Sequence, residues 1–272
     1  MPELPEVEVT RLGIEPHILN QTVAKVIVRH RGMRWPIPED VDLLTNQTID
    51  KVERRGKYLL LASKMGQLVI HLGMSGSLRI LSTDADVKKH DHFELQFTNN
   101  KILRLNDPRR FGAVLWQDWQ QATPLSQLAH LGPEPLLDDF NANYLFEKIQ
   151  KKNTVIKNFI MDSKVVVGVG NIYANESLFL AGINPLRAAK TVTKDEIDKL
   201  VTVIKKVLAE SIKQGGTTLK DFTQADGKPG YFVQSLNVYG RAGEPCVNCT
   251  QPLIECKIGQ RASVYCDYCQ SE

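Results

Sequence analysis

Leu131-Gly132-Pro133-Glu134-Pro135 separates two parts of the chain whose sequence patterns differ. One glycine and two prolines within five residues interrupt both helices and strands, which is typical of a boundary between domains. A chain of 272 residues is long enough for about two domains. We therefore predict a hinge over 131–137, with an N-terminal domain over 1–130 before it.

The N-terminal part has the pattern of a β-sandwich with one flanking helix. The apolar positions of a predicted amphipathic N-terminal helix are Val7, Leu12, Ile14 and Ile18. Short apolar or alternating runs follow at regular intervals, with turn residues such as Asn99-Asn100 between them. The expected strands cover 23–28, 58–61, 67–71, 78–81, 93–98, 102–105 and 113–117. Such spacing of short strands favours a sandwich or barrel.

The part after the hinge is mainly helical, which makes the predicted fold class α+β. Apolar residues recur with the helical period over 141–151, 153–161, 171–181 and 194–214. Glycine and proline then predict a long loop over 217–240, of a length that is usually functional. The predicted helical domain therefore covers 138–240 and leaves a small module over 241–272.

The overall composition is ordinary for a globular protein. A net charge of +3 and a hydrophobic content of 42% identify no partner by themselves. The apolar runs are only as long as strands, so no membrane partner is expected. The N-terminus lacks the basic and apolar segments of a signal peptide. We therefore expect a cytoplasmic protein.

The final module has the spacing of a four-cysteine zinc site. Two pairs, Cys246 with Cys249 and Cys266 with Cys269, are separated by sixteen residues. Disulfides are rare in the cytosol, and a redox role explains two such pairs poorly. We therefore predict one structural Zn²⁺ bound by these four thiolates, with Cys256 as a free, partly buried thiol.

Two further motifs favour binding to anions and nucleic acid. In Val166-Val167-Gly168-Val169-Gly170-Asn171, the last glycine of a dinucleotide fingerprint would fall on Tyr173, so no nucleotide cofactor is expected. A helix N-terminus with Asn171 beside it could instead bind phosphate. Phe111 follows Arg109 and Arg110 at a turn, where it could wedge into a base stack or belong to a core. Basic clusters, including Lys151, Lys152 and Lys157, add to a nucleic-acid footprint.

The first residues carry a candidate nucleophile. Removal of Met1 would leave Pro2 with a free secondary amine, which can attack an aldehyde-level carbon and form an iminium. Glu3 follows directly and could carry protons. The alternative is that Pro2 and Pro5 only start a helix.

Taken together, these motifs resemble the bacterial formamidopyrimidine-DNA glycosylases, which excise oxidised purines from DNA. The resemblance covers essentially the whole chain, and it is carried by Pro2 to Glu8, Arg54 to Tyr58, His71 to Gly76, Asp107 to Gly112, Gly168 to Glu176, and Gln260-Arg261. It implies an N-terminal β-sandwich, a helix–two-turn–helix domain and a zinc finger. It also implies a monomer that binds damaged double-stranded DNA in a cleft.

The resemblance also implies the role of each site residue. Pro2 would be the nucleophile and Glu3 the proton carrier, followed by β- and δ-elimination at the abasic site. Lys57 and Arg261 would lie on phosphates near the lesion. The remaining implied DNA contacts are His71, Met74, His90, Arg109, Phe111, Lys152 and Asn171, of which Met74, Arg109 and Phe111 fill the gap left by the flipped base. A loop over 227–231 would close on the extruded purine.

Two alternatives remain open at this point. An endonuclease VIII-like glycosylase for oxidised pyrimidines would share the nucleophile and the zinc, although that family typically begins Pro-Glu-Gly-Pro-Glu and Leu4 here favours the purine branch. A zinc-hairpin protein that binds DNA without catalysis is the other, and it gives no reason for the Pro2-Glu3 terminus.

Overall fold

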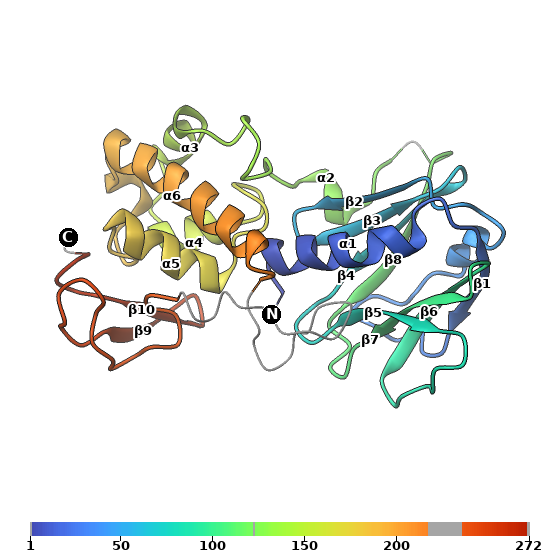
Figure 1. Cartoon of the computed structure of the whole chain (residues 1–272). Helices are drawn as coiled ribbons and strands as arrows, with labels where there is room; N and C mark the ends of the chain where they lie inside the picture. The colour runs from blue at the N-terminus through green and yellow to red at the C-terminus, as the bar shows by residue number, and fades with distance from the viewer. Residues whose placement is uncertain (1, 122, 217–235, 271–272) are drawn as a thin grey trace. The chain divides into compact units, whose positions relative to one another are not determined.

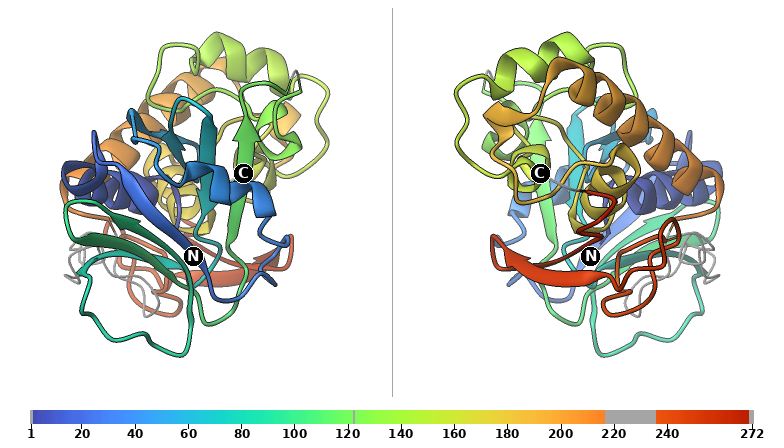
Figure 2. Two further views of the ribbon diagram at one scale, coloured as in Figure 1. Left: turned by 90° about the vertical axis from the view of Figure 1, so that its right-hand side faces the viewer. Right: turned by 90° about the vertical axis from the view of Figure 1, so that its left-hand side faces the viewer.

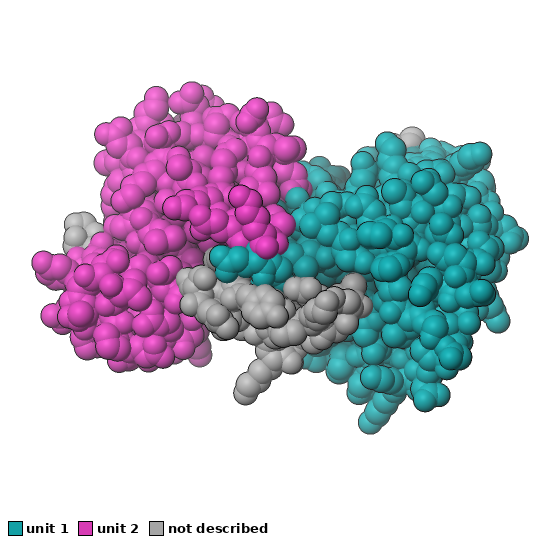
Figure 3. All heavy atoms as spheres, in the orientation of Figure 1, with its two compact units in different colours: residues 1–129, 214–233 teal, residues 130–213, 234–272 magenta. Residues whose placement is uncertain are grey.

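The computed structural model describes residues 2–121, 123–216 and 236–270 (Figure 1). The chain forms two compact units, whose boundary lies between Ala129 and His130. Of the described residues, 2–121, 123–129 and 214–216 belong to the first unit, and 130–213 and 236–270 belong to the second (Figure 3). The predicted loop around Gly227 to Tyr231 lies outside the described residues.

The first unit contains one long helix and two four-stranded sheets. Strands neighbour one another in the orders β2-β3-β4-β8 and β1-β6-β7-β5, and all their pairings are antiparallel. Figure 2 shows the two sheets from the side. The elements are α1 (Leu4–Ile18), β1 (Val23–Val28), η1 (Glu39–Leu44), β2 (Lys51–Arg55), β3 (Tyr58–Ala62), β4 (Gly66–His71), β5 (Ser77–Ser82), β6 (Asp91–Phe97), β7 (Lys101–Asn106), β8 (Ala113–Asp118) and α2 (Ser126–Ala129).

One hydrophobic core joins both sheets and α1. Leu59 and Leu61 of β3 are fully buried in it, together with Leu103 and Leu105 of β7 and Ile14 of α1. Alternate residues of each strand point inward, since side chains of a strand alternate between its two faces. The predicted sandwich with a flanking helix is therefore confirmed.

Three elements of this unit, β2, η1 and α2, were not predicted from the sequence. Strand β2 is Lys51-Val52-Glu53-Arg54-Arg55, in which only Val52 is apolar. It lies at the edge of its sheet and pairs with β3 alone, so one buried side chain suffices to fix it. The helical turn η1 likewise buries only Val41 and Leu44.

The second unit is helical, with a hairpin at its C-terminal end. Its long helix α6 buries the predicted apolar stripe, which includes Ile197, Leu200, Ile204 and Leu208. Helix α5 is buried along almost its whole length and ends at Gly182 in the left-handed conformation. The helices are α3 (Ala142–Ile149), α4 (Ile156–Met161), α5 (Asn171–Ala181), η2 (Ala189–Thr191) and α6 (Lys194–Lys213).

The C-terminal hairpin consists of β9 (Ile254–Ile258) and β10 (Arg261–Tyr265). Cys256 pairs with Ser263 across it. The predicted α+β class, with N-terminal sheets, a helical domain and a cysteine-bearing hairpin, is confirmed. None of the helices in the described parts of the chain is both long and apolar enough to cross a bilayer.

Candidate functional site

The first predicted pair, Pro2 and Glu3, lies directly before α1. Both residues are buried, and Glu3 is 1% exposed. The Glu3 N–H donates to Glu6 Oε2 at 2.9 Å, and the two residues form a reciprocal capping box. Because Glu3 caps the helix and Pro5 lies in its first turn, the helix-start interpretation is correct as a structural statement. It also fixes the Glu3 carboxylate at the N-terminal end of α1, one residue after Pro2.

Lys57 is held at a turn that is tied to α1. Glu8 accepts a hydrogen bond from Arg54 Nε at 2.8 Å, and Arg54 also donates to the Gly56 carbonyl at 3.0 Å. Burial raises the pKa of Glu8, but hydrogen bonds from Arg11 and Arg54 more than offset this and hold it below its usual value. Gly56 has φ +57°, which opens the tight turn before Lys57. Arg54 therefore stabilises this turn.

His71 lies at the end of β4 in an electropositive setting. Its Nδ1 accepts a hydrogen bond from the Gly73 N–H at 3.0 Å, and its ring lies 4.8 Å from that of Tyr58. Burial, then the charges of Lys57 and Arg34, lower the pKa of His71 to about 4. The ring is therefore neutral at pH 7, with its proton on Nε2. In that tautomer it can donate one hydrogen bond to a phosphate oxygen.

Met74, Arg109 and Phe111 lie on two loops that pack against each other. Phe111 is 46% exposed, so the alternative of a core phenylalanine is wrong. The Arg109 guanidinium carbon lies 4.9 Å from the centroid of the Phe111 ring. A Cβ atom on Gly73 would lie 2.4 Å from the Gly112 nitrogen, so the two loops meet backbone to backbone. His90 adjoins them, because its carbonyl accepts the Asp107 N–H.

In the second unit, Asn171 and Lys157 converge on the hairpin. Asn171 begins α5, and its side-chain amide donates to the Ala262 carbonyl at 3.0 Å. Lys157 of α4 donates to the same carbonyl at 3.2 Å and to the Ser263 hydroxyl. Lys157 is 1% exposed, so its grouping with the surface basic residues is wrong. Lys152, by contrast, is exposed in the turn after α3.

Two buried polar residues of α5 were not singled out by the sequence. Asn175 Oδ1 accepts the Val264 N–H at 3.0 Å. The Glu176 carboxylate accepts three backbone N–H groups of residues 237–239 and the Asn237 amide, all at 2.8 to 2.9 Å. Both side chains fix the module that follows, and a polar pattern on a helix gives no sign of it.

The four predicted cysteines come together and could hold one metal ion. Their sulfurs all lie within 4.8 Å of one another, with Cys246 and Cys269 at 3.9 Å and Cys249 and Cys266 at 3.4 Å. A tetrahedral ion with metal–sulfur bonds of about 2.3 Å separates its ligands by about 3.8 Å. Burial opposes ionisation of Cys246, but backbone N–H groups of Asn248 and Cys249 lower its pKa to about 7, whereas burial and the neighbouring thiols raise the pKa of Cys266 and that of Cys269. The type, number and spacing of the four sulfurs fit one thiolate-bound ion.

Cys256 and Arg261 lie on the hairpin away from the four sulfurs. Cys256 is a free thiol, partly buried, and burial raises its pKa. Arg261 is the first residue of β10 and is exposed. The turn before it uses positive φ at Gly259 and Gln260, so the hairpin presents Arg261 at its tip.

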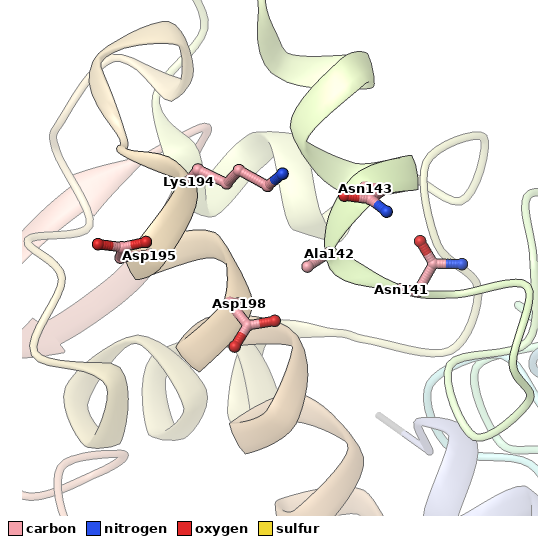
Figure 4. Close-up of a pocket in the computed structure, with 6 residues that line it drawn as sticks. All are labelled: Asn141, Ala142, Asn143, Lys194, Asp195 and Asp198. Carbon is pink, nitrogen blue, oxygen red and sulfur yellow. The ribbon is translucent and has the colours of Figure 1, made fainter.

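A surface pocket of the second unit has no part in this set of residues. It lies between the first turns of α3 and α6 (Figure 4) and is lined by Asn141, Ala142, Asn143, Lys194, Asp195 and Asp198. None of these residues was predicted to act in the site, and its two carboxylates would repel DNA.

Two family models match this chain. The model of the formamidopyrimidine-DNA glycosylase N-terminal domain matches residues 1–114. The model of the formamidopyrimidine-DNA glycosylase H2TH domain matches residues 131–223.

Two curated relatives carry the name formamidopyrimidine-DNA glycosylase. The one from Photobacterium damsela subsp. piscicida is 59% identical over 99% of this chain and 100% of its own length. The one from Colwellia psychrerythraea is 57% identical over the full length of both chains.

Solved structures give the same result. The MutM (Fpg) protein of Thermus thermophilus is 35% identical, with a TM-score of 0.90, covering 100% of this chain and 99% of that one. Lactococcus lactis Fpg in complex with DNA that contains an abasic site is 32% identical, with a TM-score of 0.91, covering 99% and 100%. A variant of the Lactococcus protein, in complex with DNA that contains Fapy-dG, has a TM-score of 0.92 at 32% identity, over all of both chains.

Proposed function

The chain belongs to the formamidopyrimidine-DNA glycosylase family, and from this premise we infer that it is a base-excision repair glycosylase which removes oxidised purines from DNA. The observation that carries its chemistry is the buried Pro2-Glu3 pair, fixed at the start of α1 by the capping box. The substrate is a damaged duplex whose target base is flipped out of the stack.

We propose that Pro2, freed of Met1, is the nucleophile. Its neutral nitrogen attacks the anomeric carbon of the damaged nucleotide, and the bond to the base breaks as the base leaves with the proton that the Pro2 nitrogen gives up. Glu3 delivers a proton to the sugar ring oxygen, so the ring opens and a cationic iminium remains. An α-amine with a pKa of about 8 is roughly 10% neutral at pH 7, whereas an ordinary lysine is far below 1%.

The same iminium supports strand cleavage, which makes the proposed enzyme a bifunctional glycosylase and abasic-site lyase. The iminium acidifies the neighbouring sugar protons. Loss of one proton expels the phosphate on the 3′ side, and a second elimination expels the phosphate on the 5′ side. The proposed product is a one-nucleotide gap with phosphate at both ends.

The proposed DNA contacts fall into two groups. Lys57, His71, His90, Lys152, Asn171 and Arg261 bind phosphates, which fixes the position of the enzyme on the duplex. Met74, Arg109 and Phe111 fill the gap left by the flipped base, and Arg109 pairs with the orphaned cytosine. The exposure of Arg109, Phe111 and Arg261 supports this assignment.

We propose that the four-cysteine site holds Zn²⁺. Four thiolates with tetrahedral spacing favour zinc among common cellular ions. When bound, the ion supplies structure only, because all four ligand positions belong to cysteines. We further propose that the protein acts as a monomer in the cytoplasm, associated with the chromosome through DNA.

Borohydride reduction in the presence of lesion DNA tests the nucleophile. Wild-type protein should be trapped on a duplex that contains 8-oxoguanine, with the adduct on the N-terminal peptide in mass spectrometry. A matched protein that keeps one extra residue before Pro2 should bind the duplex but form no adduct. Full activity of that blocked protein would refute the mechanism.

A second experiment compares lesions. A duplex with an oxidised pyrimidine in place of the purine should be the poorer substrate, and the reverse ranking would favour the endonuclease VIII-like alternative.

A further inference from the structure

A buried carboxylate joins the two loops that carry Met74, Arg109 and Phe111. Asp107 is fully buried in the first unit. Its Oδ1 accepts a hydrogen bond from the Ser75 hydroxyl at 2.6 Å, and its Oδ2 accepts the Gly112 N–H at 2.8 Å. One side chain therefore spans the loop over 72–76 and the loop over 107–112.

Ser75 continues this link to Arg109. While its hydroxyl donates to Asp107, its oxygen accepts the Arg109 N–H at 3.3 Å. Ser75 is only 8% exposed, so the hydrogen bonds are shielded from water. A buried hydrogen-bonding group that loses its partner costs free energy. Other arrangements of these two loops are therefore unfavourable.

The main chain of Asp107 fixes the remaining part of the turn. Its carbonyl accepts the Arg110 N–H at 3.2 Å and His92 Nε2–H at 3.0 Å. Arg110 has φ +56°, a conformation that residues other than glycine seldom adopt, so the turn needs such support. The Arg110 guanidinium also lies 2.7 Å from His30 Nε2.

The residues of both loops divide into buried and exposed ones in a way that suits a rigid support. Ser75, Asp107 and Gly112 are buried, whereas Arg109 and Phe111 are exposed and Met74 is partly exposed. The buried residues make the hydrogen bonds, and the residues between them face outward. Side chains that enter DNA together must keep their spacing before they bind, or the ordering cost reduces affinity.

We propose that Ser75 and Asp107 are positioning residues that make the two loops one preformed unit. The unit presents Met74, Arg109 and Phe111 to the duplex in a fixed arrangement, and it thereby sets the preference for the base opposite the lesion. This inference rests on the proposed function, in which those three side chains fill the gap in the duplex.

Ser75→Ala is the first test, with Ser63→Ala as a matched control. Ser63 is also a buried serine of the first unit, 4% exposed, and its hydroxyl donates to the Gly66 carbonyl at the other end of β4. Both variants should lower Tm by similar amounts. Ser75→Ala alone should lower kcat/KM for 8-oxoguanine opposite cytosine by about tenfold. It should also bring toward one the ratio of two kcat/KM values, the first measured with cytosine opposite the lesion and the second with adenine.

Two further measurements separate positioning from general damage. Cleavage of a single-stranded oligonucleotide with an abasic site should stay within about twofold in Ser75→Ala, because this substrate has no opposite base. In an Arg109→Ala background, Ser75→Ala should leave the ratio of cytosine to adenine unchanged, since the residue it positions is gone. Asp107→Asn should give a smaller loss than Ser75→Ala, because the amide oxygen can still accept the Gly112 N–H.

The outcomes that overturn the inference differ from those that overturn the proposed function. A wild type that cannot excise an oxidised purine refutes the function. If the wild type excises the lesion, a cytosine preference that is missing in the wild type, or unchanged in Ser75→Ala, refutes the inference. An equal change in Ser63→Ala, or an equal effect of Ser75→Ala with and without Arg109, refutes it too.

Discussion

The first unit and the C-terminal hairpin hold their site residues by different means. In the first unit, a core between two sheets fixes the strands, and backbone hydrogen bonds at Glu3, Gly73 and Asp107 fix what projects from them. The hairpin has a core of only a few side chains, around Phe179, and two of the core residues are metal-site cysteines.

This difference has a consequence for how each part can fail. A small module with so little core depends on its metal ligands and on polar contacts to α4 and α5. The first unit has a larger core, in which 23 buried apolar side chains of its described residues join both sheets and α1. We therefore expect chemistry to be lost through single residues of the first unit, and binding to be lost through any event that loosens the hairpin.

The largest expected effect tests whether the first unit alone carries the chemistry. Glu3→Gln keeps the shape of the side chain and removes its proton transfer, so excision should fall by about 10² to 10⁴-fold. Single-turnover excision and a gel-shift titration should show lost chemistry with affinity retained. Glu15→Gln, on the same helix, should excise normally. If Glu3→Gln excises as the wild type does, the proposed proton carrier is wrong.

The next effect tests whether the hairpin depends on metal. Cys266→Ser should lose the bound ion and most DNA affinity, because three thiolates no longer close the tetrahedron. Metal analysis and fluorescence anisotropy would measure both, and the thermal transition of the first unit should stay in place. Cys256→Ser should keep its metal. Unchanged metal content in Cys266→Ser would contradict the ligand set.

A smaller effect separates the position of the hairpin from its integrity. Arg261→Ala should weaken binding to abasic DNA by about tenfold and reduce the salt slope by about one phosphate contact. Metal content and Tm should be nearly unchanged, since the side chain is exposed. Lys257→Ala removes the same charge from an exposed position of β9 and should have much less effect. Equal effects of the two substitutions would mean that the hairpin contributes only its positive charge to binding, and that the place of Arg261 at the tip has no special role.

The smallest effect is a change in the free energy of unfolding caused by His71. This change appears only in acid and is absent at neutral pH. The pKa of His71 is lowered to about 4 in the folded protein, against about 6.5 in the unfolded chain. Between these values the unfolded chain binds more protons, so stability falls as pH falls from 6.5 to 4, by on the order of 1 to 3 kcal/mol. Urea unfolding across this range should show a shallower slope in His71→Gln. An identical slope would show that His71 titrates normally.

The two parts also differ in how well the sequence predicts them. The hairpin is the best case, because two cysteine pairs define a metal site without knowledge of the remaining fold. The strands were predicted wherever apolar residues recur, as in Val23–Val28, which has the expected bounds. Strand β2 was not predicted, because four of its five residues are charged. It lies at the edge of its sheet, where pairing with β3 alone supplies its hydrogen bonds across the sheet.

Helix boundaries and buried polar groups were harder to predict. Helix α4 begins at Ile156 and not at Asn153, because Val155 is drawn into an extended bridge with Ala188. Glu176 binds the main chain of residues that lie about sixty positions later in the sequence. Lys157 donates to residues more than a hundred positions away. Their polar type alone predicts a surface, and only the folded chain brings their partners to them.

The hydrogen bonds between α5 and the hairpin have a consequence for the order of assembly. Asn171 and Asn175 leave the ribosome well before the hairpin that they bind, because β10 lies about 90 residues later in the sequence. At about 5 to 20 residues per second, the helix waits several seconds for its partner. During that interval α5 exposes Phe179, around which the hairpin core packs, together with Asn171 and Asn175, whose hydrogen-bonding groups water satisfies. The apolar surface that a newly made chain leaves uncovered there while it waits for its metal is therefore limited to a few side chains.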